Sequence, residues 1–159
     1  MKIRKAKSED INELVRIINL AYRVEDFFID GDRTDEIDVK NRLQKPDALF
    51  LVIEKESNNG LAGAVYVEIK NKHGYFGLLS IDPEYQKRGL AKKLISEVEE
   101  YCLKAGCTDV DIDVVNLRVE LPGFYEHLGY HLTGDTAEFK DTSKLKKEAH
   151  FLYMTKKLK

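Results

Sequence analysis

Two stretches of the chain place apolar residues three and four positions apart, the spacing of one face of an α-helix. In the first stretch these positions are Ile11, Leu14, Val15, Ile18 and Tyr22, and in the second they are Leu90, Leu94, Ile95, Val98 and Cys102. Weaker signals favour two shorter helices, over 34–45 before Pro46 and over 121–128 with Pro122 in its first turn. The pattern therefore predicts about four helices.

Elsewhere the pattern is typical of strands. The expected strands are 2–5, 49–53, 61–69, 75–81, 109–115, 130–133 and 150–156, and 134–149 reads as a polar, lysine-rich connection. Asn59-Gly60 predicts a hairpin turn, whereas the strand, helix, strand order through 75–115 requires a crossover between parallel strands. The sequence predicts an α/β (α+β) fold, with a mixed, mostly antiparallel central sheet of about seven strands flanked by about four helices.

The size and composition are those of one folded domain. The chain has 159 residues, of which 43% are hydrophobic and 34% charged, so we expect a single domain over 1–159. No apolar run approaches the ~18 residues that a membrane span needs. The polar N-terminus lacks the pattern of a secretory signal peptide. A soluble, cytoplasmic protein without a membrane partner is expected.

The charge and the cysteines argue against two further classes. The formal net charge of -2 lacks the basic excess of nucleic-acid-binding domains, so no nucleic-acid partner is expected. Cys102 and Cys107 have no histidine or cysteine nearby at metal-ligand spacing. We interpret them as core thiols and expect neither a disulfide framework nor a bound metal.

Residues 81–94 carry the strongest chemical signal in the chain. They run as an apolar strand end, a short turn and a helix start near Gly89. The first N–H groups of a helix have no partner within it, and they point toward the turn together with the positive end of the helix dipole. Gly89 and Ala91 keep side chains out of the way, while Lys87 and Arg88 add positive charge. The segment predicts a cradle for the phosphates of a cofactor.

The spacing Gln86-x-x-Gly89-x-Ala91 resembles the acetyl-CoA pyrophosphate loop of the GNAT superfamily of N-acetyltransferases. A second segment, 123–130, reads Gly-Phe-Tyr-Glu-His-Leu-Gly-Tyr and is similar to the closing helix and strand of that superfamily. The resemblance implies a GNAT-like fold across nearly the whole chain, with acetyl-CoA as cofactor and coenzyme A as product. The cofactor-binding residues that follow are Leu79, Ser80, Ile81, Gln86, Lys87, Arg88, Gly89, Leu90, Ala91, Lys92, Asn116 and Tyr125.

Acetyl transfer to an amine needs a stabilised oxyanion, a proton for the leaving thiolate and a neutral amine. The resemblance places the oxyanion donor at a strand end, where we assign the role to the backbone N–H of Ile81, and it makes Tyr125 the general acid. The base is open. Glu68 ranks first, Asp111 and Asp113 are alternatives on another strand expected to flank the cleft, and solvent can take the same role. The predicted catalytic side chains are therefore Tyr125 and Glu68.

The acceptor pocket is expected where the first helix ends and the second begins. The substrate-binding residues predicted there are Tyr22, Arg23, Glu25 and Arg33. Acids crowd the segment 25–38, and carboxylates favour a cationic amine such as a polyamine or a lysine-like group. The arginines instead favour a substrate with a carboxylate, and acids near a helix N-terminus are favoured by the dipole alone. These alternatives stay open.

The sequence therefore predicts an N-acetyltransferase that moves the acetyl group of acetyl-CoA to a primary amine, on a small molecule or a peptide, by direct attack in a ternary complex. The alternative is a non-catalytic acyl-CoA-binding regulatory module that uses the same cradle. Tyr66, Val67 and the closing strand 150–156 could supply a sheet edge for a homodimer.

Overall fold

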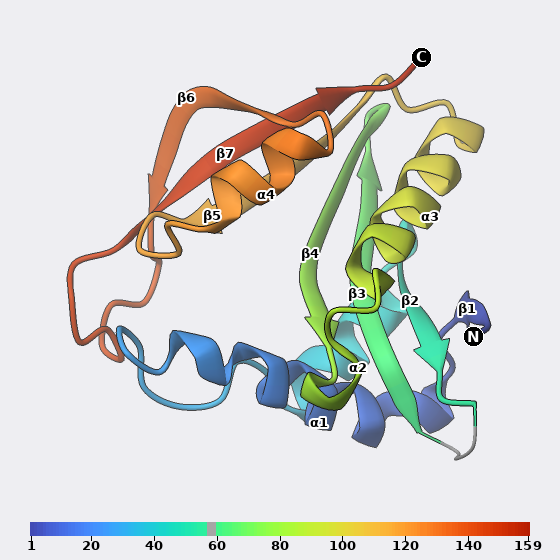
Figure 1. Ribbon diagram of the computed structural model, residues 1–159, viewed down its shortest axis with the longest axis horizontal. Helices are drawn as coiled ribbons and strands as arrows, with labels where there is room; N and C mark the ends of the chain where they lie inside the picture. Colours follow the sequence, from blue (N-terminus) through green and yellow to red (C-terminus); the bar gives the residue numbers. More distant parts are fainter. Residues whose placement is uncertain (57–59) are drawn as a thin grey trace.

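A seven-stranded sheet spans the computed structural model, which describes residues 1–56 and 60–159 (Figure 1). The hairpin turn predicted at Asn59 lies outside the described residues. All neighbouring strands are antiparallel except β4 and β5, which confirms the predicted mixed sheet. The strands, in the order β1-β2-β3-β4-β5-β7-β6, are β1 (Ile3–Lys5), β2 (Ala48–Glu54), β3 (Leu61–Lys70), β4 (His73–Ile81), β5 (Asp109–Val115), β6 (His131–Glu138) and β7 (His150–Lys157).

Helices cover both faces of the sheet (Figure 1). The apolar side chains of α1 and α2 form one core with the sheet, and those of α3 and α4 form a second core on the opposite face. No helix in the described part of the chain is long and apolar enough to cross a membrane. The helices are α1 (Ile11–Ala21), α2 (Glu36–Gln44), α3 (Leu90–Lys104) and α4 (Leu121–His127), with short 3-10 turns η1 (Ser8–Asp10), η2 (Tyr22–Glu25) and η3 (Pro83–Tyr85).

The separation of β4 from β5 positions the functional site. The two strands pair only through His73–Tyr75 and Asp109–Asp111. Farther along, the pairing of β4 with β3 is irregular, and Leu78 has a left-handed backbone with a φ of 53°. Between the pairs Ala64–Ser80 and Tyr66–Gly77, β4 contains one residue more than β3. Such an extra residue, a β-bulge, bends a strand and increases its twist. The sheet therefore opens between β4 and β5 (Figure 1).

Strand β6 is longer than the sequence predicts. Residues 134–149 read as a polar connection, yet β6 continues to Glu138. Its pairing with β7 shifts between Leu132 and Thr136, and Gly134 between them has a φ of 92°. This irregularity breaks the two-residue period that marks a strand, so the second half of β6 does not show in the sequence pattern.

The predicted sheet edge at Tyr66 and Val67 is wrong. Both residues lie on β3, which has β2 on one side and β4 on the other, and they are only 1% and 0% exposed. The closing strand β7 is also interior, between β5 and β6. The edges of the described sheet are β1 and β6, because β7 inserts beside β5 instead of adding at the end.

Candidate active site

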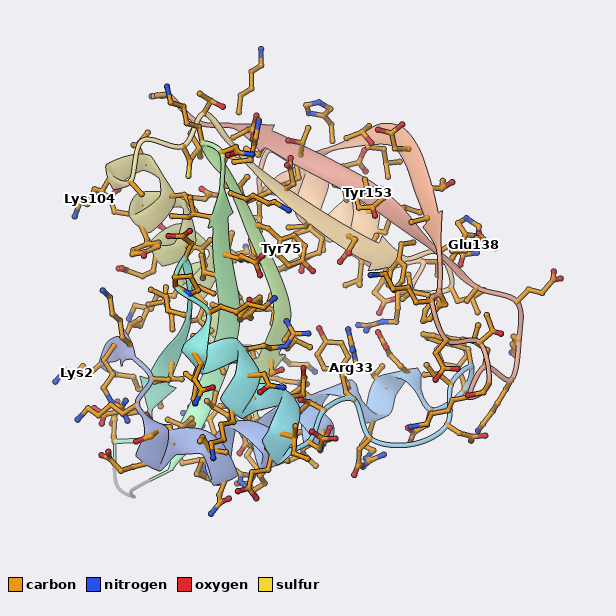
Figure 2. All side chains as sticks on the ribbon, turned by 180° about the vertical axis from the view of Figure 1, so that it is seen from behind. Lys2, Arg33, Tyr75, Lys104, Glu138 and Tyr153 are labelled. Carbon is orange, nitrogen blue, oxygen red and sulfur yellow. The ribbon has the colours of Figure 1, made fainter. Side chains whose placement is uncertain are left out.

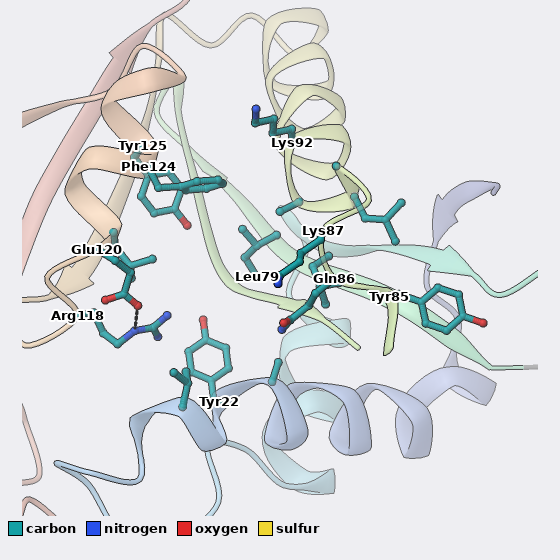
Figure 3. Close-up of a pocket in the computed structure, with 17 residues that line it drawn as sticks. Tyr22, Leu79, Tyr85, Gln86, Lys87, Lys92, Arg118, Glu120, Phe124 and Tyr125 are labelled. Carbon is teal, nitrogen blue, oxygen red and sulfur yellow. Dashed lines mark hydrogen bonds and ion pairs between the residues drawn. The ribbon is translucent and has the colours of Figure 1, made fainter. Parts of the chain in front are cut away.

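A cavity of about 800 Å³ lies where the start of α3, the end of β4 and the start of α4 meet (Figure 3). Its walls also include the end of α1 and the segment that joins β5 to α4. Residues far apart in the sequence therefore face the same space. Of the predicted cofactor residues, the cavity brings together Leu79, Ile81, Gln86, Lys87, Gly89, Leu90, Ala91, Lys92 and Tyr125.

The loop before α3 has a backbone suited to anion binding. Lys87 and Gly89 both adopt left-handed conformations, with φ values of 64° and 75°. Such conformations within a tight turn direct successive N–H groups toward one side. A Cβ added to Gly89 would meet nothing within 4 Å, so the space beside this residue is open. The loop can therefore approach a phosphate closely with its N–H groups.

The charges at the start of α3 are the reverse of those on α1 and α2. The first turns of α1 and α2 carry acids, as the helix dipole favours, whereas the first turn of α3 has no acid and contains Lys92, followed by Lys93. A lysine at a helix N-terminus is unfavourable by roughly 0.3–1 kcal/mol in the absence of an anion. The arrangement becomes favourable with an anion at the turn, which supports the predicted phosphate cradle.

Three predicted cofactor residues lie outside this cavity. The guanidinium of Arg88 stacks over the ring of Tyr85, 4.8 Å from its centroid. Ser80 is fully buried and its hydroxyl donates to a carbonyl within β4. The side-chain oxygen of Asn116 accepts from the backbone N–H of His150 at 2.8 Å, which ties the end of β5 to the start of β7. The structure gives each of these side chains a partner within the chain instead of a place at the cavity.

The end of β4 offers backbone N–H groups on its open side. The N–H of Asp82 donates to the carbonyl of Ala62 at the β3 side, at 2.9 Å. Because successive residues of a strand point their N–H groups to opposite sides, the N–H of Ile81 points away from β3, toward the side that β5 has left open. The side chains of Leu79 and Ile81 line the cavity. This arrangement supports the assignment of the Ile81 N–H as an oxyanion donor.

Tyr125 projects from α4 into the cavity (Figure 3). Its ring packs against Phe76, Phe124 and Tyr130, with centroids 6.1, 5.1 and 5.9 Å away, and the residue is only 7% exposed. Its hydroxyl points toward the hydroxyl of Tyr22 in Figure 3. Burial raises the pKa of Tyr125 well above its usual value, so the phenol keeps its proton at neutral pH and stays available as a donor.

A second cavity, of about 80 Å³, adjoins the first in the gap between β4 and β5. The larger and the smaller cavity share wall residues, among them Tyr22, Leu79 and Tyr125. A cofactor in the larger cavity and a small acceptor in the smaller one would therefore meet beside Tyr125. The charged and polar side chains that line the smaller cavity are Tyr22, Glu25, Arg33, Arg42, Tyr75, Asp113, Arg118 and Tyr125.

Glu25 and Arg118 form an ion pair at the junction of the two cavities. The Nη1 of Arg118 donates to Glu25 at 2.9 Å, and its Nε donates to Glu120 at 2.8 Å, the contact drawn in Figure 3. The side chains of Glu25 and Arg118 are 8% and 14% exposed. Burial raises the pKa of Glu25, and the hydrogen bond from Arg118 opposes that shift. The pair ties η2 to the segment before α4 and so holds the two walls together.

Asp113 is one of two carboxylates that line the smaller cavity, and the other, Glu25, is paired with Arg118. Asp113 accepts a hydrogen bond from the hydroxyl of Tyr75 at 3.1 Å. Burial raises the pKa of Asp113, while the hydrogen bond from Tyr75 and the charge of Arg33 oppose the shift. Asp111, on the same face of β5, instead accepts from Thr155 at 2.6 Å and lines a different hollow. Of Asp111 and Asp113, only Asp113 is placed to take a proton from an acceptor in the gap.

Glu68, ranked first as the base, lines neither cavity. Its carboxylate accepts a hydrogen bond from the hydroxyl of Tyr66 and lies 3.5 Å from the Nζ of Lys45. The hydrogen bond from Tyr66 lowers the pKa of Glu68, because it stabilises the ionised form. Glu68 thus belongs to a polar cluster beside α2, and the structure does not support it as the base.

The acids of segment 25–38 do not gather around the smaller cavity, where only Glu25 appears. Arg23, a predicted substrate residue, lines neither of the two cavities, whereas Tyr22 and Arg33 do line the smaller one. Most of the remaining acids pair with nearby cations or cap α2. The partners are Arg23 for Asp26 and Asp32, Lys146 for Asp30, Arg42 for Asp38, and the Asp38 N–H for Asp35.

The polar contributors to the smaller cavity include residues that were not predicted. Tyr75 comes from the start of β4, and Arg42 comes from α2. No local motif marks either residue, because each reaches the cavity only through the separation of β4 and β5 and the packing of α2 on the sheet.

Comparisons with known proteins identify the family of the chain. The sequence profile of the Acetyltransferase (GNAT) family matches residues 11–130. The chain is 31% identical over 109 residues to N-acetyltransferase 8B of Homo sapiens, covering 65% of this chain and 48% of that protein. It is 34% identical over 101 residues to an acetyltransferase of Yersinia pestis (strain Pestoides F), covering 64% of this chain and 70% of that protein. The match spans about half the length of the human relative.

Solved structures share the fold. The smu.2055 protein of Streptococcus mutans UA159 has a TM-score of 0.80 and 16% identity, with all of both chains covered. The ribosomal-protein-S18-alanine N-acetyltransferase of Escherichia coli has a TM-score of 0.78 and 14% identity, covering 98% of this chain and 92% of that one. PaiA N-acetyltransferase of Thermoplasma acidophilum, solved with coenzyme A, has a TM-score of 0.72 and 22% identity, covering 99% and 98%. The chain belongs to the acetyltransferase (GNAT) family, whose members are acyltransferases.

Proposed function

We propose that this chain, as one domain over 1–159, is an acetyl-CoA-dependent N-acetyltransferase that acetylates a primary amine by direct attack in a ternary complex. The observation that carries the proposal is the junction of two unlike cavities at Tyr125 and Leu79. The larger has an anion-binding loop and an apolar wall, and the smaller has a carboxylate beside open space. Two substrates held in these cavities would have their reacting groups close together.

The larger cavity fits acetyl-CoA. The loop 86–91 and Lys92 would hold the pyrophosphate, since they supply N–H donors and positive charge. The apolar side chains of Leu79, Ile81 and Phe124 would line the pantetheine arm. When bound, the cofactor supplies an activated acetyl thioester.

Three groups of the chain would then stabilise charge and move protons. The backbone N–H of Ile81 would be the hydrogen-bond donor for charge that develops on the thioester oxygen, and the hydroxyl of Tyr125 would be the proton donor for the departing thiol. The carboxylate of Asp113 accepts a proton from the acceptor ammonium, directly or through a water. This last step matters because a lysine-like amine near pH 7.4 lies about three units below its pKa, so deprotonation costs about 4 kcal/mol.

The proposal is tested by two measurements on the purified chain. Calorimetry reports acetyl-CoA binding, and thiol release at pH 8 reports turnover with amino acids, polyamines, aminoglycosides and short peptides. Acceptor-dependent release, with an N-acetylated product identified by mass spectrometry, would support an enzyme. Binding without release for any acceptor would favour the non-catalytic acyl-CoA-binding module, and the absence of binding would contradict both.

A further inference from the structure

We propose that the acceptor carries a carboxylate as well as its amine, as a free amino acid does, and that Arg33 binds this carboxylate while Asp113 faces the amine. The inference rests on the proposed function and names the substrate class of the same site. It makes Arg33 the residue that determines acceptor specificity.

The smaller cavity contains charges of both signs, and most of them already have partners. Arg118 pairs with Glu25 at 2.9 Å, and Arg42 pairs with a carboxylate on α2 at 3.1 Å. Within 1–56 and 60–159, no ion pair of 4.0 Å or less joins Arg33 or Asp113 to an opposite charge. These two groups are therefore the charges of the cavity that remain available to a ligand.

Arg33 and Asp113 come from different walls of the same space. Arg33 lies in the loop between η2 and α2, with its guanidinium carbon 5.3 Å from the centroid of the Tyr22 ring, and Figure 2 shows it beside the gap in the sheet. Stacking on a ring leaves the N–H groups at the edge of a guanidinium free for a carboxylate. Asp113 lies on β5 and is held by Tyr75. A separated cation and anion in one small cavity match the two charged ends of a zwitterion.

The size of the cavity favours an amino acid over larger acceptors. Its volume of about 80 Å³ is roughly five to eight times the space that one water requires. A polyamine would bring a second positive charge toward Arg33, where like charges repel. A peptide N-terminus has an amide in place of the α-carboxylate and would leave Arg33 without its partner.

The test compares each standard amino acid with its α-amide and its decarboxylated amine, by acetyl-CoA-dependent thiol release with product identification. For the amino acid that the enzyme acetylates best, we expect kcat/KM for the free acid to exceed kcat/KM for its α-amide by about tenfold or more. Arg33→Gln should lower kcat/KM for the free acid by about tenfold or more and change kcat/KM for the α-amide by no more than about twofold. Arg33→Lys should restore part of the lost kcat/KM for the free acid. Lys40→Gln, which removes an exposed cation from α2, should change neither value.

Three results would contradict the inference. Equal kcat/KM for acids and amides would overturn it and leave the proposed function intact, as would an Arg33→Gln variant that keeps the full preference for the acid. Failure to acetylate any acceptor, with acetyl-CoA binding intact by calorimetry, would instead contradict the proposed function and the inference with it.

Discussion

The hydroxyl of Tyr75 on β4 donates to Asp113 on β5 at 3.1 Å, although the strand register places Tyr75 opposite Asp111. The contact therefore runs diagonally, past the last paired residues of the two strands. It holds a half-buried carboxylate at the point where the sheet opens. Burial of an acid without an ion partner reduces stability, and such groups occur preferentially at functional sites.

Asp113→Asn is expected to lower kcat/KM by about tenfold or more, because the amide cannot accept the proton of the acceptor. Burial raises the pKa of Asp113, so in the parent enzyme the acid limb of the rate profile should lie above the ordinary aspartate value of about 3.9. Measurement of kcat/KM against pH for both proteins checks this. Asp111→Asn is the matched control, and an unchanged rate in Asp113→Asn would show that solvent serves as the base.

Although Asp113→Asn is expected to lower activity, it is not expected to lower the stability of the fold. Because the pKa of Asp113 is raised in the folded state, its protonation stabilises the fold fully below pH ~3.9, and this stabilisation is lost as the pH rises through the folded-state pKa. At pH 7 the ionised carboxylate therefore reduces stability. Asp113→Asn should show an unchanged or higher Tm at pH 7 in thermal melts, and a clearly lower Tm would contradict this account.

Tyr125→Phe should lower kcat by about tenfold or more and leave the Kd for acetyl-CoA within about twofold. The ring keeps its contacts with Phe76 and Phe124, so only the hydroxyl is lost. Steady-state kinetics and calorimetry separate the two effects. Tyr153→Phe, on β7 and outside both cavities, is the control. An unchanged kcat in Tyr125→Phe would remove this hydroxyl from the mechanism.

The two ends of α3 supply a matched pair of glycines. Gly89 and Gly106 have φ values of 75° and 87°, and a Cβ at either would meet nothing within 4 Å. Alanine at either position is strained by roughly 1–2 kcal/mol. Only Gly89 lies at the loop proposed to bind the pyrophosphate, so Gly89→Ala should weaken acetyl-CoA binding by about tenfold, while Gly106→Ala should lower Tm alone. Equal Kd values in calorimetry would argue against the loop as the pyrophosphate site.

The N-terminal strand is held by Arg4, which pairs with Asp10 at 2.8 Å and with Glu54 at 3.0 Å. The hydrogen bond from Arg4 lowers the pKa of Asp10, so its stabilising effect is present above the unfolded-state value of about 3.9 and is lost as the pH falls through the folded-state pKa. Asp10→Asn should reduce the free energy of unfolding at pH 7 by about 1 kcal/mol, allowing for solvent screening.

Thermal melts of Asp10→Asn check this, with an expected loss of about 2–4 °C at pH 7 that disappears once the pH is below the folded-state pKa of Asp10. The control is Asp30→Asn, which removes an exposed pair with Lys146 and should change Tm very little. If Asp10→Asn and Asp30→Asn changed Tm by the same amount, the ion pair of Arg4 with Asp10 would stabilise the fold no more than an exposed pair does.

The loop 86–91 and Tyr125, which the structure brings to one cavity, could be singled out from the sequence because their signals are local. A strand end, a turn and a helix start lie within 81–94, and the helix dipole acts on the turn directly before the helix. The C-terminal half of β6 could not be predicted in this way, since Gly134 interrupts its alternation. The pairing of Asn116 with the N–H of His150 depends on β7 lying beside β5, an order that no local pattern reveals.

Local sequence patterns could not identify which acid is placed to act as the base. Glu68 and Asp113 are both acids on strands, and alternation along a strand tells only that neighbouring side chains point to opposite faces. It does not tell where β4 leaves β5, which is the feature that gives Asp113 open space and leaves Glu68 with Tyr66 and Lys45.

Sequence patterns alone were enough for the period of each main element and for the family to which both motifs point, because periodicity and helix-end chemistry act over a few residues. They also predict the phosphate cradle at Gly89, which stays a prediction. Two relations emerge from the folded chain: Arg33 and Asp113 share one cavity, and Arg118 is neutralised by Glu25. These relations depend on contacts between segments separated by 80 or more positions, as the numbering of each pair shows. Such contacts are set by packing and burial, which one-dimensional patterns do not specify.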